Sequence, residues 1–536
     1  MRPATDDVPA GALPTTTTPG AHVTSTTSSP TPTAQPAPPD DARITLVLRV
    51  LTAAAFVVIL NETLMMNALP PLMEVFAIDA SVGQWLTTGF MLTMAVVIPM
   101  TGWLLQRVSI RTAFALAMGT FIVGTALCAL APSFSILLLG RVVQACGTAV
   151  MMPLLMTTIM TMVPADRRGR VMGNLTLAMS VAPALGPTVS GIILQFGSWR
   201  WLFGLVLPVA VLMTVAGVRL LRSSDPGRPA RLDVLSVLLT ALGFGGLVYG
   251  LSAFGKAAGG GAALNPVWTL VVGVVALALF VWRQVALQRR DQPFLDLRTL
   301  RHSRYAVALG LLCLSFMALI GAMLLLPIAL QEVRGMSVLQ SGLMLMPGAL
   351  AMGLLGPTVG RLYDRVGPRP LVVPGAVVLV AAMATLALSV QHAPWWALVA
   401  LHSVISVALA FLFTPVFTAG LGALPTRLSS HGSALLGASQ QVAGAAGAAL
   451  VVTVMQVTAA TLARGGATEV AALGDGIRVA LLVGAALAAG VVVLALFVRR
   501  PEGEEDARPG DSGTAHQGSA EADPPAKAEH TAYPGA

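Results

Sequence analysis

Apolar runs long enough to cross a lipid bilayer recur along this chain, and they constrain its fold more than any other feature. A helix that crosses about 30 Å of hydrocarbon needs roughly 20 apolar residues, and lipid cannot hydrogen-bond an exposed backbone. The sequence therefore predicts an all-α polytopic membrane protein with fourteen transmembrane helices. The predicted segments are 46–68, 84–105, 112–131, 135–162, 171–195, 201–220, 234–254, 267–287, 305–328, 339–360, 370–390, 395–418, 435–458 and 477–498.

Composition excludes several other classes of protein. Hydrophobic residues make up 55% of the 536 residues and charged residues only 10%, against roughly 25% charged residues in a soluble domain. The net charge of +8 comes from basic residues dispersed among short loops, whereas a nucleic-acid-binding protein gathers them in one patch. The three cysteines lie inside apolar runs without metal-site or disulfide spacing. We expect no nucleic-acid partner, metal or cofactor.

The loops and tails predict an orientation in the membrane. Arginines concentrate in alternate loops, and all eight tryptophans lie near predicted segment ends, as the positive-inside rule and an aromatic belt require. Residues 1–42 and 501–536 are polar tracts with too few apolar residues to fold, so we expect disordered tails. An even number of spans then predicts a multi-pass protein of the inner (cytoplasmic) membrane with both termini in the cytoplasm.

A pair of similar turns indicates an internal repeat. Residues 102–111 and 360–369 share Gly, Leu, Arg, Val and Arg at matching positions. The repeat predicts two six-helix halves, 43–222 and 301–500, separated by two inserted helices in 223–300. An arrangement of two halves around a cavity at the membrane midplane is suited to alternating access.

Only two charged residues lie deep inside the predicted helices, Glu62 and Arg141. A charge near the bilayer centre costs about 2.5–3.5 kcal/mol or more, so such residues are rarely without a role. Arg141 shares one helix face with Gln144, Ala145 and Thr148. A buried carboxyl near a guanidinium can change between its protonated and ionised forms as that partner or a substrate moves. The pair is therefore a candidate proton-coupling site, and a static ion pair that only fixes helix packing is the alternative.

The fifth predicted segment carries a face of small residues and two prolines. Such a face allows a kinked helix to approach its neighbour closely. Small residues and prolines recur here at every fourth position: Ala178, Ala182, Gly186 and Ser190 in one row, and Pro183, Pro187 and Gly191 in another.

Taken together, these motifs resemble the major facilitator superfamily, in particular its fourteen-helix drug:proton antiporter branch of the EmrB/QacA type. The turn from Gly360 to Arg369 resembles the loop signature of the superfamily, with Asp364 and Arg365 in its other charged positions. In the earlier copy Gln106 replaces the acid. The resemblance implies that these turns control conformational change.

Two further motifs resemble those of this branch. Arg141, Gln144 and Gly147 match a fourth-helix motif that the resemblance links to proton transfer. In the fifth helix, the matching positions imply an exporter; they are Pro183, Gly186, Pro187 and Gly191.

The first predicted helix resembles the lincomycin-resistance subgroup. The branch usually has an aspartate where this chain has Asn61, and here the acid is Glu62, displaced by about 100° around the helix. Either position is open as the proton site. The resemblance implies export of a drug or antibiotic in exchange for protons. The alternatives are export of an endogenous metabolite or lipid-like compound, and a transporter-like sensor without transport.

Five polar residues and one methionine are candidates to line the substrate cavity, although ordinary packing is the alternative for each. The set comprises Asn61, Met65, Asn67, Gln144, Gln440 and Gln441. His402, alone in the twelfth segment, is interpreted as a hydrogen-bonded core residue. A membrane-embedded enzyme would need a cluster of His, Asp or Cys at one depth, and the predicted helices contain none. We therefore expect no enzyme activity.

Overall fold

The computed structural model describes residues 41–65, 68–78, 80–83, 85–221, 233–257, 265–290 and 293–499. In this part of the chain the regular structure is entirely helical. The predicted tails lie outside the described residues, apart from Asp41 and Ala42, which begin the first helix. The all-α fold predicted from the sequence is confirmed.

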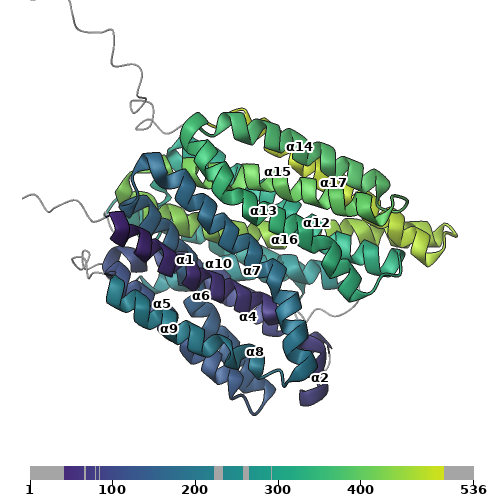
Figure 1. The fold of residues 1–536 in the computed structure, drawn as a ribbon, viewed down its shortest axis with the longest axis horizontal. Helices are drawn as coiled ribbons and strands as arrows, with labels where there is room; N and C mark the ends of the chain where they lie inside the picture. Colours follow the sequence, from purple (N-terminus) through teal and green to yellow (C-terminus); the bar gives the residue numbers. More distant parts are fainter. Residues whose placement is uncertain are drawn as a thin grey trace, which may run out of the picture. The chain divides into compact units, whose positions relative to one another are not determined.

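The helices fall into three sets along the chain (Figure 1). The first group comprises α1 (Asp41–Leu64), α2 (Leu69–Phe76), α3 (Ala80–Gly83), α4 (Trp85–Arg107), α5 (Ile110–Ala129), α6 (Phe134–Met162), α7 (Arg168–Phe196), α8 (Trp201–Gly204) and α9 (Val206–Leu220). The inserted pair is α10 (Val234–Ala257) and α11 (Pro266–Gln288). The second group comprises α12 (Ser303–Ile328), α13 (Val338–Val366), α14 (Arg369–Ser389), α15 (Trp395–Gly422), α16 (Ser429–Arg464) and α17 (Glu469–Ala495).

Most of these helices can cross a membrane. Among the described residues, 13 helices are long and apolar enough to do so. Helix α7 is 29 residues long but is not one of the 13, and the side chains of Ala184, Pro187 and Thr188 within it lie outside the described residues. The count of fourteen transmembrane helices stays a prediction.

Short polar turns end one helix and start the next. Ser109 caps α5, because its hydroxyl accepts the backbone N–H of Thr112 at 3.2 Å. Ser337 and Gln340 form a capping box at the start of α13. Each cap satisfies backbone donors that the helix itself leaves unpaired. Gly367, with φ of 81°, ends α13 in a conformation that favours glycine.

The two groups pack their helices in the same pattern. Helix α1 packs on α7 and α9, as α12 packs on α16 and α17. Helix α5 packs on α6 and α9, as α14 packs on α15 and α17. Helix α4 contacts α6, as α13 contacts α15. The similarity that the sequence shows in two turns therefore extends to the pairing of whole helices.

Backbones meet directly where α5 crosses α6. A Cβ added at Gly147 would lie 2.7 Å from the backbone nitrogen of Phe121 and would collide with the carbonyl oxygen of Ala117. A Cβ at Gly140 would lie 2.7 Å from the sulfur of Cys128. Small residues at such crossings let membrane helices gain dispersion and backbone contacts. This crossing fixes the helix face that carries Arg141.

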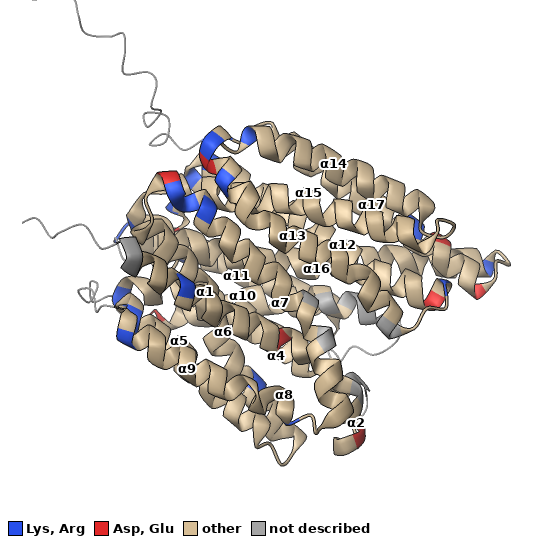
Figure 2. Cartoon of the chain, viewed as in Figure 1, with Lys and Arg blue, Asp and Glu red and all other residues tan. Residues whose placement is uncertain are grey.

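Charged residues gather at the helix ends, and the middle of the bundle is nearly free of them (Figure 2). Most of the arginines and lysines among the described residues lie at one end, on the left in Figure 2. Arg107 at the end of α4, Arg219 in the last turn of α9 and Arg365 in the last turn of α13 belong to this arginine-rich end.

We predict that Gly147→Ala destabilises the protein by about 1–3 kcal/mol, because the added methyl group overpacks the crossing of α5 and α6. The matched control is Gly119→Ala, since no atom lies within 4 Å of a Cβ at Gly119. That control should be neutral or stabilising by up to about 1 kcal/mol. Thermal unfolding of the detergent-solubilised variants measures both, and equal melting temperatures would contradict the packing described.

Candidate functional site

Arg141 is the largest fully buried side chain described in the protein, at 1% exposure. Its Nη1 donates to Oε1 of Gln144 at 2.7 Å, and its Nε donates to the carbonyl oxygen of Leu86 at 3.5 Å. Its guanidinium carbon lies 4.0 Å from the centroid of the Phe90 ring, a cation–π contact that strengthens out of water. Residues of α4 and α6 therefore hold the guanidinium in one orientation.

Gln144 connects Arg141 to the helix crossing beneath it. It is fully buried, and its Nε2 donates to Oγ1 of Thr125 at 2.8 Å. Thr125 in turn donates to the carbonyl oxygen of Phe121 at 2.7 Å. The amide of Gln144 is thus hydrogen-bonded to protein on both sides, and its place in a substrate cavity stays a prediction.

Glu62 lies half-buried in α1, and α1 packs on α6, the helix that carries Arg141. The two side chains do not form an ion pair, for which a nitrogen–oxygen distance of 4.0 Å or less is required. The static ion pair considered as an alternative is therefore absent from this conformation.

The predicted cavity residues divide into buried and partly exposed sets. Asn61 and Met65 are buried at 1% and 4% exposure, and Oδ1 of Asn61 has no hydrogen-bond partner among the described residues. A buried acceptor without a protein partner is a place where a ligand or water can donate. Gln440 and Gln441 are half-buried in α16, and Asn67 lies outside the described residues.

The small face of α7 meets α1 beside Glu62. A Cβ at Gly186 would lie 2.6 Å from Cβ of Thr63, and Oγ1 of Thr63 lies 3.4 Å from the carbonyl oxygen of Ala182. Gly186 therefore allows the close approach that the sequence predicted. At Gly191 a Cβ would meet nothing within 4 Å. Pro183 is half-buried in the same helix, and nothing is described of the Pro187 side chain.

The second group carries a different residue where the first carries Arg141. Arg141 is the eighth residue of α6, and His402 is the eighth of α15. Arg141 stacks on Phe90, twelve residues before Gly102, whereas His402 lies against Gly348, twelve residues before Gly360. His402 interacts with the backbone of Leu345, and its Nδ1 has no partner among the described residues. The two groups are alike in backbone and differ in buried charge.

Helices α7 and α13 form one seam between the two groups. The backbone N–H groups of Gly169 and Arg170 donate to the two carboxylate oxygens of Asp364, at 2.8 and 2.9 Å. A Cβ at Gly360 would lie 2.7 Å from the carbonyl carbon of Gly169, so the backbones touch. A carboxylate at a helix N-terminus also interacts favourably with the helix dipole. Asp364 thus joins the second group to the start of α7, and Arg365 and Arg369 near it are exposed.

Helices α4 and α16 form the other seam, with a neutral contact in place of the charged one. Nε2 of Gln106 donates to the carbonyl oxygen of Arg427 at 3.1 Å. A Cβ at Gly102 would lie 2.8 Å from Nδ1 of His431. The earlier turn therefore still connects the two groups, although it lacks the acid.

Next to each seam, a pair of hydroxyl side chains forms a further hydrogen bond between the two groups. Thr176 of α7 bonds Thr414 of α15 at 2.8 Å, and Thr157 of α6 bonds Ser433 of α16 at 3.0 Å. The two groups are thus in contact toward the arginine-rich end. Sequence reasoning missed these four residues, because a single hydroxyl in an apolar helix gives no sign of its partner.

Comparison with protein families and curated proteins identifies relatives over most of the chain. The family model of the Major Facilitator Superfamily matches residues 51–448. An uncharacterized MFS-type transporter of Bacillus subtilis, YcnB, is 38% identical and covers 87% of this chain and 97% of its own. The lincomycin resistance protein LmrB of Listeria monocytogenes is 37% identical and covers 83% and 95%. A multidrug resistance protein B homolog of Mycobacterium tuberculosis is 29% identical and covers 70% and 69%.

Solved structures share the fold at low sequence identity. The proton:xylose symporter XylE superposes with a TM-score of 0.59 at 15% identity, covering 85% of this chain and 96% of its own. The human organic anion transporter MFSD10 has the same TM-score and identity, with 86% and 100% covered. These structures confirm the expected fold. The family match and the relatives above confirm the expectation of a transporter and not an enzyme.

We predict that Asp364→Ala weakens the α7–α13 seam, because two N–H groups and a helix N-terminus lose their acceptor, a loss of about 0.5–2 kcal/mol. A cysteine placed at the buried Thr176 should then react faster with a maleimide, by about two- to thirtyfold. Asp166→Ala is the matched control, since Asp166 is 67% exposed. Equal labelling rates in the two variants would contradict the role assigned to Asp364.

Proposed function

Because the chain belongs to the major facilitator superfamily, we propose that it is a proton-coupled antiporter that exports drug-like or antibiotic small molecules across the cytoplasmic membrane. The observation that carries the proposal is the arrangement of Glu62 and Arg141. Glu62 on α1 and Arg141 on α6, two helices in contact, place opposite charges within the first group without an ion pair between them. Such a pair can exchange a proton when a third charge or a conformational change intervenes.

The relatives support the substrate class. Proteins named for lincomycin resistance and multidrug resistance align with most of this chain. We infer that the substrate is a drug-like or antibiotic small molecule. Met65 offers an adaptable apolar surface, Asn61 an acceptor, and Gln440 and Gln441 polar contacts from the second group.

In the proposed cycle Glu62 carries the proton and Arg141 modulates it. Gln144, the carbonyl of Leu86 and the Phe90 ring hold Arg141. The position of its positive charge relative to α4 and α6 is therefore fixed. Movement of α1 relative to α6 changes the distance between the two charges, and with it the affinity of Glu62 for a proton. One charge moving down 100 mV supplies roughly 2.3 kcal/mol for export.

We propose the following organisation for this cycle. Residues 43–222 and 301–500 act as two halves, with the drug:proton antiporter branch of fourteen helices as the subgroup. The arginine-rich end faces the cytoplasm, as does each terminus. The contacts of Asp364 and Gln106 toward that end then correspond to a state closed on the cytoplasmic side. Opening on that side requires both seams to part.

A second candidate is export of an endogenous metabolite or lipid-like compound by the same route, and a sensor without transport is the third. A dye-retention assay in cells that express the chain, with and without an uncoupler, tests proton-coupled drug export against these alternatives. Dye loss that the uncoupler stops supports proton-coupled drug export. Dye loss indifferent to the uncoupler supports another coupling ion or no transport of that dye.

We predict that Glu62→Gln abolishes export driven by a pH gradient in proteoliposomes, because the amide cannot release a proton. Exchange of labelled substrate for unlabelled substrate, which needs no net proton movement, should continue. Lincomycin is a suitable probe. The matched control is Glu74→Gln on α2, since Glu74 is exposed.

Two results would decide against this role. Export at the wild-type rate in Glu62→Gln would remove Glu62 from the coupling mechanism. Loss of exchange together with loss of export, at normal thermal stability, would show that Glu62 serves substrate binding and not proton transfer.

A further inference from the structure

The inserted pair forms a single tightly packed hairpin. A Cβ at Gly246 of α10 would lie 3.0 Å from Cα of Gly273 of α11, and a Cβ at Gly243 would lie 3.2 Å from the nitrogen of Leu277. Backbones this close leave little room for the two helices to shift against each other. The hairpin is expected to move as one unit.

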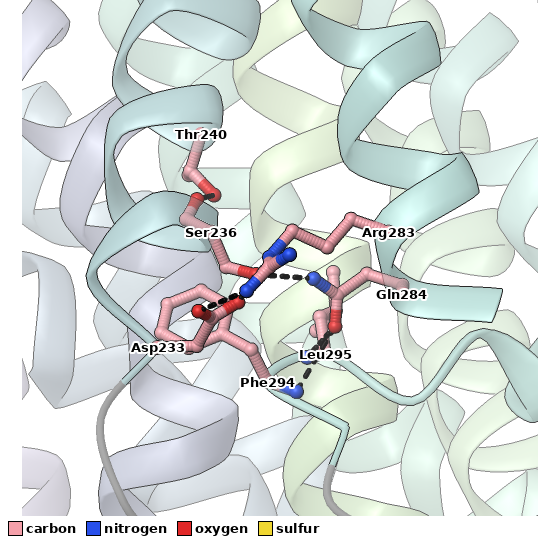
Figure 3. A network of polar contacts seen from close by, with 7 residues as sticks. All are labelled: Asp233, Ser236, Thr240, Arg283, Gln284, Phe294 and Leu295. Atoms are coloured by element: carbon pink, nitrogen blue, oxygen red, sulfur yellow. Dashed lines mark hydrogen bonds and ion pairs between the residues drawn. The ribbon is translucent and has the colours of Figure 1, made fainter. Parts of the chain in front are cut away.

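A polar network ties the two helices together at one end of the hairpin (Figure 3). Nε and Nη2 of Arg283 each donate to a carboxylate oxygen of Asp233 at 2.7 Å. This bidentate pair is partly shielded from solvent, with 30% and 19% of the two side chains exposed. The guanidinium beside Asp233 lowers the pKa of that carboxyl. The ion pair therefore persists at pH values where a carboxyl group would ordinarily take up a proton.

The same network extends into the segment that leads to the second group. Gln284 is fully buried; its Nε2 donates to Oγ of Ser236 at 2.7 Å, and its Oε1 accepts the N–H groups of Phe294 and Leu295 at 2.9 and 3.0 Å. Figure 3 shows these bonds converging between α10, α11 and the 294–295 backbone. The hairpin is thereby attached to the chain that enters α12.

That connecting segment is itself fixed to the second group. Residues 297–301 form a short 3₁₀ turn that contacts both α12 and α16. Asp296 is buried, accepts a hydrogen bond from Gln288 of α11 at 3.1 Å, and interacts electrostatically with His431 of α16. Hydrogen bonds therefore attach the hairpin to the connecting segment, and that segment packs on two helices of the second group.

Helix α10 also lies across the seam between the groups, because it packs on both α4 and α16. Its contact with α4 has a different character. A Cβ at Gly245 would lie 3.3 Å from the Leu92 side chain and 3.5 Å from that of Val96. The rings of Trp85 and Tyr249 stack with centroids 6.0 Å apart. Apolar and stacking contacts of this kind are less directional than a bidentate ion pair.

We propose that the α10–α11 hairpin moves as part of the second group and slides over α4, covering the α4–α16 seam while the two groups rearrange. This inference rests on the proposed transport cycle, since it concerns a motion between the groups. The inserted helices then close one of the two seams to lipid at each stage of transport. The α7–α13 seam has no comparable contact with α10 or α11 in the described part of the chain.

Distances between spin labels test which group the hairpin follows. Three exposed positions near the arginine-rich helix ends, Arg111 on α5, Arg289 after α11 and Arg361 on α13, are changed to cysteine in pairs. The background lacks Cys128, Cys146 and Cys313, and the full chain is placed in lipid nanodiscs. Distance distributions are recorded at high and low pH, with and without lincomycin. The 111–361 pair reports motion between the groups.

We expect the 111–361 and 111–289 distances to shift together while the 289–361 distance stays constant. Arg283→Gln, which breaks the ion pair, should broaden the 289–361 distribution in every condition. If the 111–289 distance stays constant and the 289–361 distance shifts, the hairpin follows the first group and the proposal is overturned. It is overturned as well if the 111–289 and 289–361 distances both shift. If 111–361 itself never shifts, the proposed cycle fails first, which separates that failure from failure of the hairpin inference.

Discussion

Direct contact between helix backbones, at positions where glycine removes the side chain, is the constraint on which the rest of this structure depends. At Gly147 it brings α5 against α6, and so turns Arg141 inward. At Gly186 it brings α7 against α1 beside Glu62. At Gly360 it brings the second group against the first, within reach of the bonds that Asp364 accepts. In lipid, apolar side chains gain little free energy when they move from the lipid into the protein interior. Close packing and the polar contacts that it permits therefore stabilise much of the association between helices.

The buried charges of the protein are asymmetric although its backbone is repeated. Arg141 with its fixed partners belongs to the first group, and the corresponding position of the second group holds His402. The seams differ in the same way, since one closes on the carboxylate of Asp364 and the other on the amide of Gln106. In the proposed mechanism this asymmetry assigns proton handling to the first group, while the second group moves against it and takes the hairpin along.

Much of the fold could be predicted from the sequence. Lipid requires long apolar runs to form helices, and the repeated turn indicated two similar groups of helices. The close approach at Gly186 followed from the spacing of small residues. The engagement of Gln144 with Arg141 and Thr125 could not be predicted, since a polar face that would suit a cavity suits a buried hydrogen-bond network equally well. The hydrogen bond between Thr176 and Thr414 could not be predicted either, because it joins positions far apart in sequence. The attachment of the hairpin through Gln284 depends on backbone groups of Phe294 and Leu295, which leave no trace in residue type.

The central claim is that Glu62 gains and loses a proton as substrate is exchanged. Infrared difference spectroscopy of the protein in lipid, recorded before and after addition of lincomycin, observes the protonated carboxyl directly through its carbonyl stretching band. The account predicts that a band of a protonated carboxyl disappears when substrate binds, and that this change is absent from Glu62→Gln. The same difference band in Glu62→Gln, or no carboxyl change on binding in the wild-type protein, would contradict it.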